Sequence, residues 1–266
     1  MEITEKDREK LSHVFDNTTA TYKFYWMLSL LDIVEQGRAH STITFEEMVA
    51  RMVSKAWQPA KIGLFDFGKC DTLCRRIDNL IVSSPLNIMS MEDRVRCFIT
   101  SNRDMKSIKM LVKEMTKYVP YRFLYPWIGV CNNSEAQQLS QQDTRRTLYY
   151  IKDKTLVINP IWRKYLIENS IYLHGWAFER LCIFLNQRNP GYILPASSDC
   201  RLTADGTTLL HYSLPISDCT AFAAEHLRHT TKLHANKLVI TGDMQNINSS
   251  VNIKFNIENT DKPEKK

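Results

Sequence analysis

The stretch from Tyr22 to Val34 constrains the fold of this chain most, because its apolar residues fall on every side of a helical turn. A helix that is apolar all round is stable in water only when other elements cover it. With about 13 residues, interrupted by Lys23 and Asp32, it is shorter than the roughly 20 residues that cross a bilayer. The sequence therefore predicts a buried helix at the centre of a helical core.

The composition is that of an ordinary globular protein. Of the 266 residues, 44% are hydrophobic and 24% are charged, which suits one large domain or two small ones. The charged opening segment lacks the apolar core of a signal peptide, and no later stretch is long enough to span a membrane, so we expect a cytoplasmic protein. The seven cysteines are odd in number and scattered, which argues against a secreted disulfide framework.

Most of the chain is predicted to be helical. Hydrophobic periodicity, caps and breaks predict helices at 41–59, 70–82, 90–99, 104–118, 159–167, 170–186 and 221–235. The aromatic segment 119–130, with its two prolines, is predicted to be extended, and 198–218 to be irregular. Strands at 147–151 and 155–158 are predicted to form a hairpin, and the region 147–158 resembles the wing of a winged helix.

The fold class predicted from these elements is mainly α, with a small β-hairpin and a C-terminal β element. We expect a helical core domain at 1–198, an irregular segment with one helix at 199–237, and an asparagine-rich β tail at 238–266. Strands are predicted in this tail at 237–241 and 251–257. The second strand alternates strictly, so it is either an edge strand of its own domain or a docking strand. Its interaction candidates are Val251, Ile253, Phe255 and Ile257.

The net charge of +6 is concentrated in two stretches, 101–125 and 144–168, each with six basic and two acidic residues. A concentrated basic face favours an acidic partner such as nucleic acid. On the helix predicted to end near residue 118, lysines share one side and apolar residues another; a solvated helix face is the alternative interpretation. The candidate nucleic-acid-binding residues are Lys106, Lys109, Lys113, Lys117, Arg145, Arg146, Lys152 and Lys154.

Four segments together carry a resemblance to a known family. They are TYKFYWMLSLLDIV at 21–34, ITFEEMVARMVSKAWQP at 43–59, VPYRFLYPW at 119–127 and FLNQRNPG at 184–191. In this order they resemble the N-terminal, non-catalytic region of bacterial HNH endonuclease domain proteins, which belong to restriction-like and phage-defence systems. The segments are packing and loop sequences, so the resemblance implies a domain and does not by itself imply an activity.

The nuclease half of that family is not recognisable in the sequence. An HNH site needs a histidine base and His, Asn or Asp metal ligands on a strand-strand-helix unit. The segment after residue 191 offers no Asp-His or His-His pair on a predicted strand; the alternative catalytic set is His226, His229, His234 and Asn236. No zinc spacing, phosphate-binding glycine loop or hydrolase motif appears, so we predict no metal site and no cofactor.

Three functions remain open from the sequence. The favoured one is a non-catalytic accessory or recognition subunit of a bacterial antiviral defence or restriction-like system, which binds nucleic acid, a partner protein or both. The first alternative is a metal-dependent HNH-like nuclease with a divergent C-terminal site. The second is a homo-oligomeric scaffold that assembles through the C-terminal strand.

Overall fold

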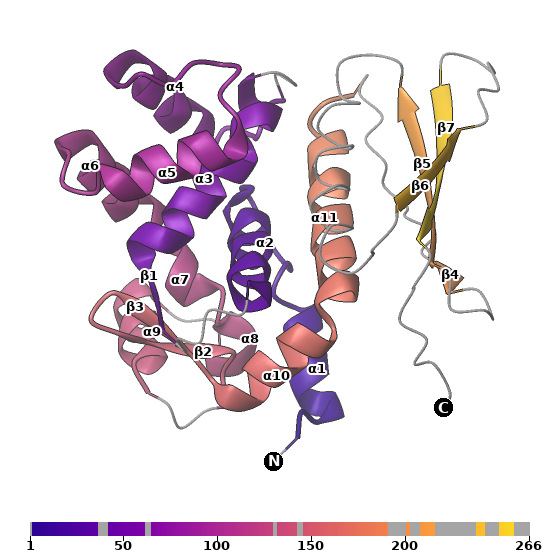
Figure 1. Cartoon of the computed structure of the whole chain (residues 1–266). Helices are drawn as coiled ribbons and strands as arrows, with labels where there is room; N and C mark the ends of the chain where they lie inside the picture. The colour runs from indigo at the N-terminus through magenta and orange to yellow at the C-terminus, as the bar shows by residue number, and fades with distance from the viewer. Residues whose placement is uncertain are drawn as a thin grey trace, which may run out of the picture. The chain divides into compact units, whose positions relative to one another are not determined.

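The computed structural model describes residues 2–36, 42–61, 65–129, 132–142 and 146–190, together with the backbone of four strands beyond residue 200 (Figure 1). The chain divides into two compact units. Unit 1 comprises Met1–Lys61 and Phe67–Ala177, and unit 2 comprises Ile62–Asp66 and Phe178–Lys266. The division falls inside helix α11 (Ser170–Asn186), upstream of the domain boundary expected at residue 198.

Unit 1 is mainly helical, as the sequence predicts. Its helices before α11 are α1 (Glu5–Ser12), α2 (Tyr22–Glu35), α3 (Phe45–Lys61), α4 (Leu73–Ser83), α5 (Glu92–Ser101), α6 (Lys106–Met115), α7 (Val119–Arg122), α8 (Tyr125–Ile128), α9 (Asn133–Ser140) and α10 (Pro160–Glu168). Its strands are β1 (Thr42–Thr44), β2 (Tyr149–Lys152) and β3 (Thr155–Ile158). Among the helices that the structure describes, none combines the length and the hydrophobicity that a membrane crossing requires.

Helix α2 is the buried helix that the apolar stretch predicts. Every residue from Phe24 to Val34 is buried, on all sides of the helix. Helices α3, α7 and α10 pack against α2, and Figure 1 shows α2 beside α3 in the interior of the unit. Because these side chains are apolar on all sides of the helix, covering them removes apolar surface from water and stabilises the unit.

The segment 119–130 was predicted to be extended, and this prediction is wrong. It forms two short helices, α7 and α8, with Pro120 and Pro126 in their first turns. Proline is tolerated there, because the first backbone N–H groups of a helix have no partner within the helix. Similarly, α3 does not stop at Pro59 but continues to Lys61.

The predicted hairpin is confirmed and gains a third strand. Strands β2 and β3 are antiparallel, and β1 pairs with the other edge of β3, so the strand order is β1-β3-β2. Asp153 and Lys154 form the turn with φ values of 49° and 59°. Two successive positive φ values are typical of a type I′ turn, whose twist suits a two-residue hairpin.

Tyr149 on β2 joins three elements of the core. Its ring is fully buried, and its hydroxyl accepts a hydrogen bond from Trp26 Nε1 of α2 at 3.0 Å and donates one to the carbonyl oxygen of Pro120 on α7 at 2.7 Å. Burial raises the pKa of the Tyr149 hydroxyl well above its usual value, so the group stays protonated and keeps its donor.

Replacing Tyr149 with phenylalanine is expected to lower the free energy of unfolding by about 1–3 kcal/mol, because a buried donor and a buried acceptor both lose their partner. The measurement is urea unfolding followed by tryptophan fluorescence. The neighbouring Tyr150 is only partly buried, so Tyr150→Phe is the matched control and should change stability by less than about 0.5 kcal/mol. Equal effects of the two substitutions would contradict the role of the Tyr149 hydroxyl.

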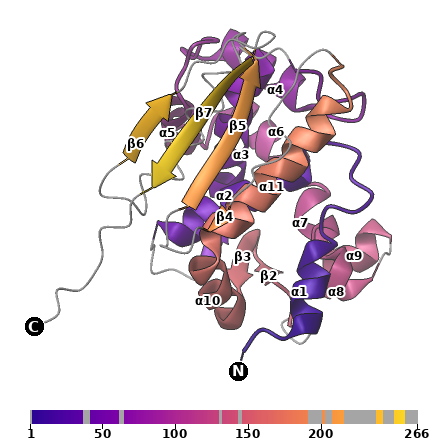
Figure 2. The ribbon, with the colours of Figure 1, turned by 90° about the vertical axis from the view of Figure 1, so that its right-hand side faces the viewer.

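Unit 2 contains a four-stranded antiparallel sheet with the order β4-β5-β7-β6. The strands are β4 (Arg201–Leu202), β5 (Thr208–Pro215), β6 (Leu238–Gly242) and β7 (Ser250–Ile257), and Figure 2 shows β5 and β7 running side by side in opposite directions. The strands predicted at 237–241 and 251–257 are therefore present. The prediction of irregular structure for 198–218 is wrong, because β5 pairs along its full length with β7. The helix predicted at 221–235 lies outside the described residues.

Candidate functional site

The lysine side of α6 is exposed, as the sequence predicts. Ile108, Leu111 and Met115 are buried on one side of this helix, where α3 and α4 pack against it. The lysine row comprises Lys106, Lys109 and Lys113 on the opposite, exposed side and Lys117 just beyond the end of the helix; Met110, which is 47% exposed, lies on the same side. With a rise of about 1.5 Å per residue, a row of this length is comparable with the distance between several successive phosphates of a nucleic-acid strand.

The acidic residues near the lysine row neutralise little of its charge. Glu114 is the single acid within α6, and its carboxylate pairs with Arg76 of α4. Asp104 lies 3.1 Å from Lys109 Nζ, but the two side chains are 88% and 63% exposed. Such a pair is worth about 0–1 kcal/mol, so Lys109 can exchange this partner for a phosphate.

The start of α6 adds a further positive contribution. Met105 occupies the N-cap position without a side-chain hydrogen bond, and the first turn contains no acidic residue. The unpaired N–H groups of a helix start carry partial positive charge, which is usually offset by a capping oxygen or a carboxylate. At α6 this end carries Lys106 instead, so the local field favours an anion.

An aromatic ring lies directly beyond the lysine row. Tyr118 is 36% exposed, with Lys117 Nζ 4.9 Å and the Arg122 guanidinium carbon 4.5 Å from the centre of its ring. Arg122 donates from Nε and Nη2 to Asn133 Oδ1 at 3.2 and 3.0 Å. The three side chains Lys117, Tyr118 and Arg122 form the cation-aromatic cluster, which the sequence analysis did not identify.

The other predicted basic residues lie elsewhere. Lys152 and Lys154 are exposed at the β2–β3 turn, which Figure 1 places apart from α6. Arg146 donates to Asp7 Oδ2 at 2.8 Å and to the carbonyl oxygen of Glu2 at 2.9 Å, so its guanidinium is engaged within unit 1. Arg145 lies outside the described residues. The structure therefore gathers the α6 lysines into one row and leaves the second basic stretch separate.

The remaining sequence candidates belong to unit 2. The alternative catalytic set, His226, His229, His234 and Asn236, lies outside the described residues. The interaction candidates Val251, Ile253, Phe255 and Ile257 lie on β7, which pairs with β5 on one edge and with β6 on the other. Strand β7 is therefore an inner strand of its sheet and not an edge strand.

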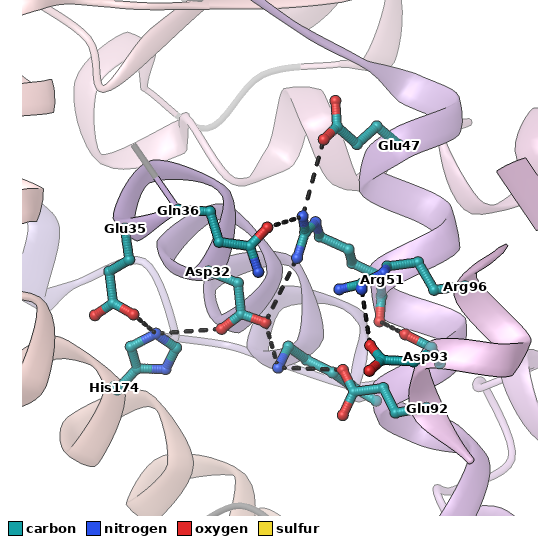
Figure 3. Close-up of polar contacts among 11 residues, drawn as sticks. Asp32, Glu35, Gln36, Glu47, Arg51, Glu92, Asp93, Arg96 and His174 are labelled. Atoms are coloured by element: carbon teal, nitrogen blue, oxygen red, sulfur yellow. Dashed lines mark hydrogen bonds and ion pairs between the residues drawn. The ribbon is translucent and has the colours of Figure 1, made fainter. Parts of the chain in front are cut away.

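Unit 1 also contains a buried ionic network that was not predicted from the sequence (Figure 3). Asp32 of α2 is at its centre: its Oδ2 lies 2.6 Å from Lys55 Nζ and 4.0 Å from Arg51 Nη1, and its Oδ1 lies 3.3 Å from His174 Nε2. Arg51 and Lys55 come from α3, and His174 comes from α11. All four residues are buried, so these charges interact with little screening by solvent.

Further acidic residues surround this centre. Glu92 at the start of α5 lies 3.5 Å from Lys55 Nζ, and Glu35 of α2 lies 3.6 Å from His174 Nε2. Lys55 and His174 thus each lie near two carboxylates. The network connects α2, α3, α5 and α11, and Figure 3 shows the labelled side chains converging from these helices.

The charges in the network stabilise one another. Burial by itself raises the pKa of Asp32, but the positive charges of Lys55 and His174 outweigh it and hold the pKa of this carboxyl below its usual value. Burial lowers the pKa of Lys55, and Asp32 and Glu92 outweigh it, so the pKa of this ammonium is raised. Both groups therefore remain charged at neutral pH.

One signal for this network was present in the sequence. Asp32 interrupts an otherwise apolar helix, and a carboxylate on a helix that is buried all round needs a cationic partner. The chemistry of the network is ion pairing within the core. Within the described ranges, no group of three or more His, Cys, Asp or Glu side chains is arranged to hold a metal ion.

Comparisons with the known protein families, with curated protein sequences and with solved structures find no match for this chain. Function must therefore be inferred from the surfaces and clusters described above.

Proposed function

We propose that this chain binds nucleic acid through the lysine row of α6 and acts as a recognition module. The observation that carries the proposal is the positive charge of that row, which nearby acidic residues neutralise only in small part. Its lysines are exposed, and the single acid within α6 pairs with Arg76 instead of with a lysine. Phosphates are the polyanion that such a row of cations fits, because they repeat at a regular spacing along a strand.

The buried ionic network is not the binding site, which leaves the lysine row as the binding surface. Its titratable groups are held by neighbouring charges in the interior, where they stabilise the packing of α2 against α3 and α11. A ligand as large as a nucleic acid meets the outside of the molecule, where α6 lies. We assign the network to the stability of the core and the lysine row to binding.

The biological setting of the proposal comes from the resemblance stated above. In that setting the chain is an accessory subunit of a bacterial antiviral defence or restriction-like system, with a partner that supplies the chemistry. Affinity purification from the native cells, before and after a high-salt wash, tests this setting. A stoichiometric protein that survives the wash supports it, and purification of the chain alone contradicts it.

The double substitution Lys109→Glu and Lys113→Glu is expected to weaken nucleic-acid binding by about tenfold or more, because it removes two phosphate contacts and adds two repulsions. The logarithm of the affinity should also depend less steeply on the logarithm of the salt concentration, by about one for each lost contact. Fluorescence anisotropy with a labelled oligonucleotide over a salt series gives both quantities.

The matched control changes the net charge equally at two other exposed lysines. Lys6 on α1 and Lys164 on α10 are both exposed, so Lys6→Glu with Lys164→Glu produces the same total charge. This variant should keep most of the affinity and the original salt dependence. An equal loss in both double variants would mean that net charge alone drives binding, and the assignment to α6 would then fail.

A further inference from the structure

We infer that the ligand is a single-stranded nucleic acid, with the lysine row holding its phosphates and the cation-aromatic cluster stacking against a base. This inference rests on the proposed function and deepens it. The observation behind it is the continuity of the row with an exposed ring: Lys113 and Lys117 end the row, and Tyr118 follows at once. Phosphate contacts hold any strand, whereas stacking requires a base whose face is accessible.

The backbone that holds the Tyr118 ring is fixed at the start of α7. The backbone carbonyl oxygen of Tyr118 accepts hydrogen bonds from the N–H groups of Tyr121 and Arg122 at 3.2 and 2.9 Å. The next two residues, Val119 and Pro120, are buried in the core. The ring therefore projects from a fixed position, and a base that stacks against it does not have to order a mobile loop first.

Arg122 is positioned to take part in stacking. Two of its nitrogens donate to the same Asn133 oxygen, which fixes the planar guanidinium over the Tyr118 ring. That partner is a neutral amide, and among the described residues no carboxylate pairs with Arg122. Its charge is therefore available to a phosphate, and its plane is available to a base.

Lys117 can leave the ring when a ligand arrives. Its ammonium lies 4.9 Å from the centre of the Tyr118 ring, and its side chain is exposed on a flexible stem. An exposed cation-π contact of this kind contributes about 0.5–1 kcal/mol, which a phosphate contact compensates. Turning Lys117 toward a phosphate would uncover the ring for a base.

A duplex cannot use this arrangement fully. In double-stranded DNA the base faces are stacked inside the helix, so a protein reaches only base edges and the backbone. The bases of a single strand are free to stack on aromatic rings and guanidinium planes, at about 1–3 kcal/mol per base. The cluster at the end of the row therefore predicts a preference for unpaired strands over duplexes of equal charge.

The test measures the affinity of the full chain for three probes by fluorescence anisotropy at one salt concentration. The probes are a labelled single-stranded oligonucleotide, a labelled duplex of the same sequence, and inorganic polyphosphate as unlabelled competitor. We expect the single strand to bind about tenfold or more tightly than the duplex. Polyphosphate should compete less effectively than the unlabelled single strand at equal phosphate concentration.

Variants of Tyr118 test whether the preference for single strands depends on its ring. Tyr118→Leu should lower single-strand affinity by about tenfold while leaving duplex affinity unchanged, and Tyr118→Phe, which keeps the ring, should restore the preference. Tyr172 is an exposed tyrosine on α11, so Tyr172→Leu is the matched control and should keep wild-type binding of both probes. Circular dichroism melting of each variant checks that the fold is retained.

The outcomes separate this inference from the proposed function. Equal affinity for single strand and duplex, no effect of Tyr118→Leu, or equally effective competition by polyphosphate would overturn the preference for single strands and leave phosphate binding by α6 in place. The absence of binding to every probe would overturn both. An affinity for single strands that is lost in Tyr118→Leu and kept in Tyr118→Phe supports the inference.

Discussion

Replacing Lys55 with methionine is expected to lower the free energy of unfolding by about 3–5 kcal/mol, the largest effect that we predict for a single charged residue. Methionine keeps the length and most of the volume of the side chain but removes the ammonium that lies 2.6 Å from Asp32 and 3.5 Å from Glu92. Two acidic groups at the centre of unit 1 then lose their main counter-charge while one of them stays fully buried. Equilibrium urea unfolding gives the change.

A double-mutant cycle isolates the pair. Asp32→Asn removes the charge that Lys55 neutralises, so the double variant should be less destabilised than the two single changes added together. The matched control is Lys164→Met, because Lys164 pairs with Glu168 at 3.8 Å with both side chains mostly exposed. This control should change stability by less than about 0.5 kcal/mol. A loss below about 1 kcal/mol for Lys55→Met would contradict the role assigned to the network.

Acid should weaken the ion pair between Asp32 and Lys55, and the direction of this pH dependence follows from the pKa of Asp32. This pKa is lowered in the folded state, so the carboxylate contributes stability above the unfolded pKa of about 3.9. That contribution is lost as the pH falls through the lower folded pKa. The stability difference between the wild type and Asp32→Asn should therefore be largest at neutral pH and shrink below about pH 4.

Replacing Trp162 with alanine is expected to lower the free energy of unfolding by about 3–5 kcal/mol. The Trp162 side chain on α10 is fully buried, and its ring meets those of Trp127 and Tyr165 edge to face, with centroids 5.6 and 5.7 Å away. Its Nε1 also donates to the carbonyl oxygen of Arg146 at 2.9 Å. Alanine leaves a large cavity and an unpaired carbonyl at one site.

Phenylalanine at the same position separates these two contributions. Trp162→Phe keeps a ring in contact with Trp127 but loses the donor to Arg146, so it should cost clearly less than alanine. Urea midpoints with unchanged slopes would show that both variants unfold from the same native state. If alanine and phenylalanine cost the same, the hydrogen bond would carry the effect and the cavity argument would be wrong.

The parts of the fold that follow from local patterns were predictable. The apolar stretch of α2 and the alternation of the hairpin are visible in consecutive residues, and both are present in the structure. The prediction of an extended segment at 119–130 is wrong, because proline is tolerated both in extended segments and in the first turn of a helix. Pro120 and Pro126 take the second role, and the residues buried in these two helices include Pro120, Trp127 and Ile128.

The candidate site was predictable to the same extent. The lysine row follows from spacing along one helix. The cation-aromatic cluster needs Asn133 of α9 to hold Arg122, and this contact joins separate helices. Arg146 is one of the predicted nucleic-acid-binding residues, but its guanidinium pairs with Asp7, 139 residues away in the sequence. Contacts of this kind depend on tertiary packing, which no local pattern reports.

The strand order of unit 2 determines at which strand edges a second chain could add a strand. The asparagine-rich β7 is paired along its full length with β5 and from Ile253 to Ile257 with β6, so copies of β7 cannot stack along the whole strand while the sheet is intact. Strand β4 pairs with only Thr208 and Leu209 of β5. Among the described strands, the rest of the outer edge of β5, the outer edge of β6 and the β6-facing edge of β7 at 250–252 remain open. Any templated growth from the folded chain would begin there, and Pro215, which lacks an N–H group, limits it at one end of β5.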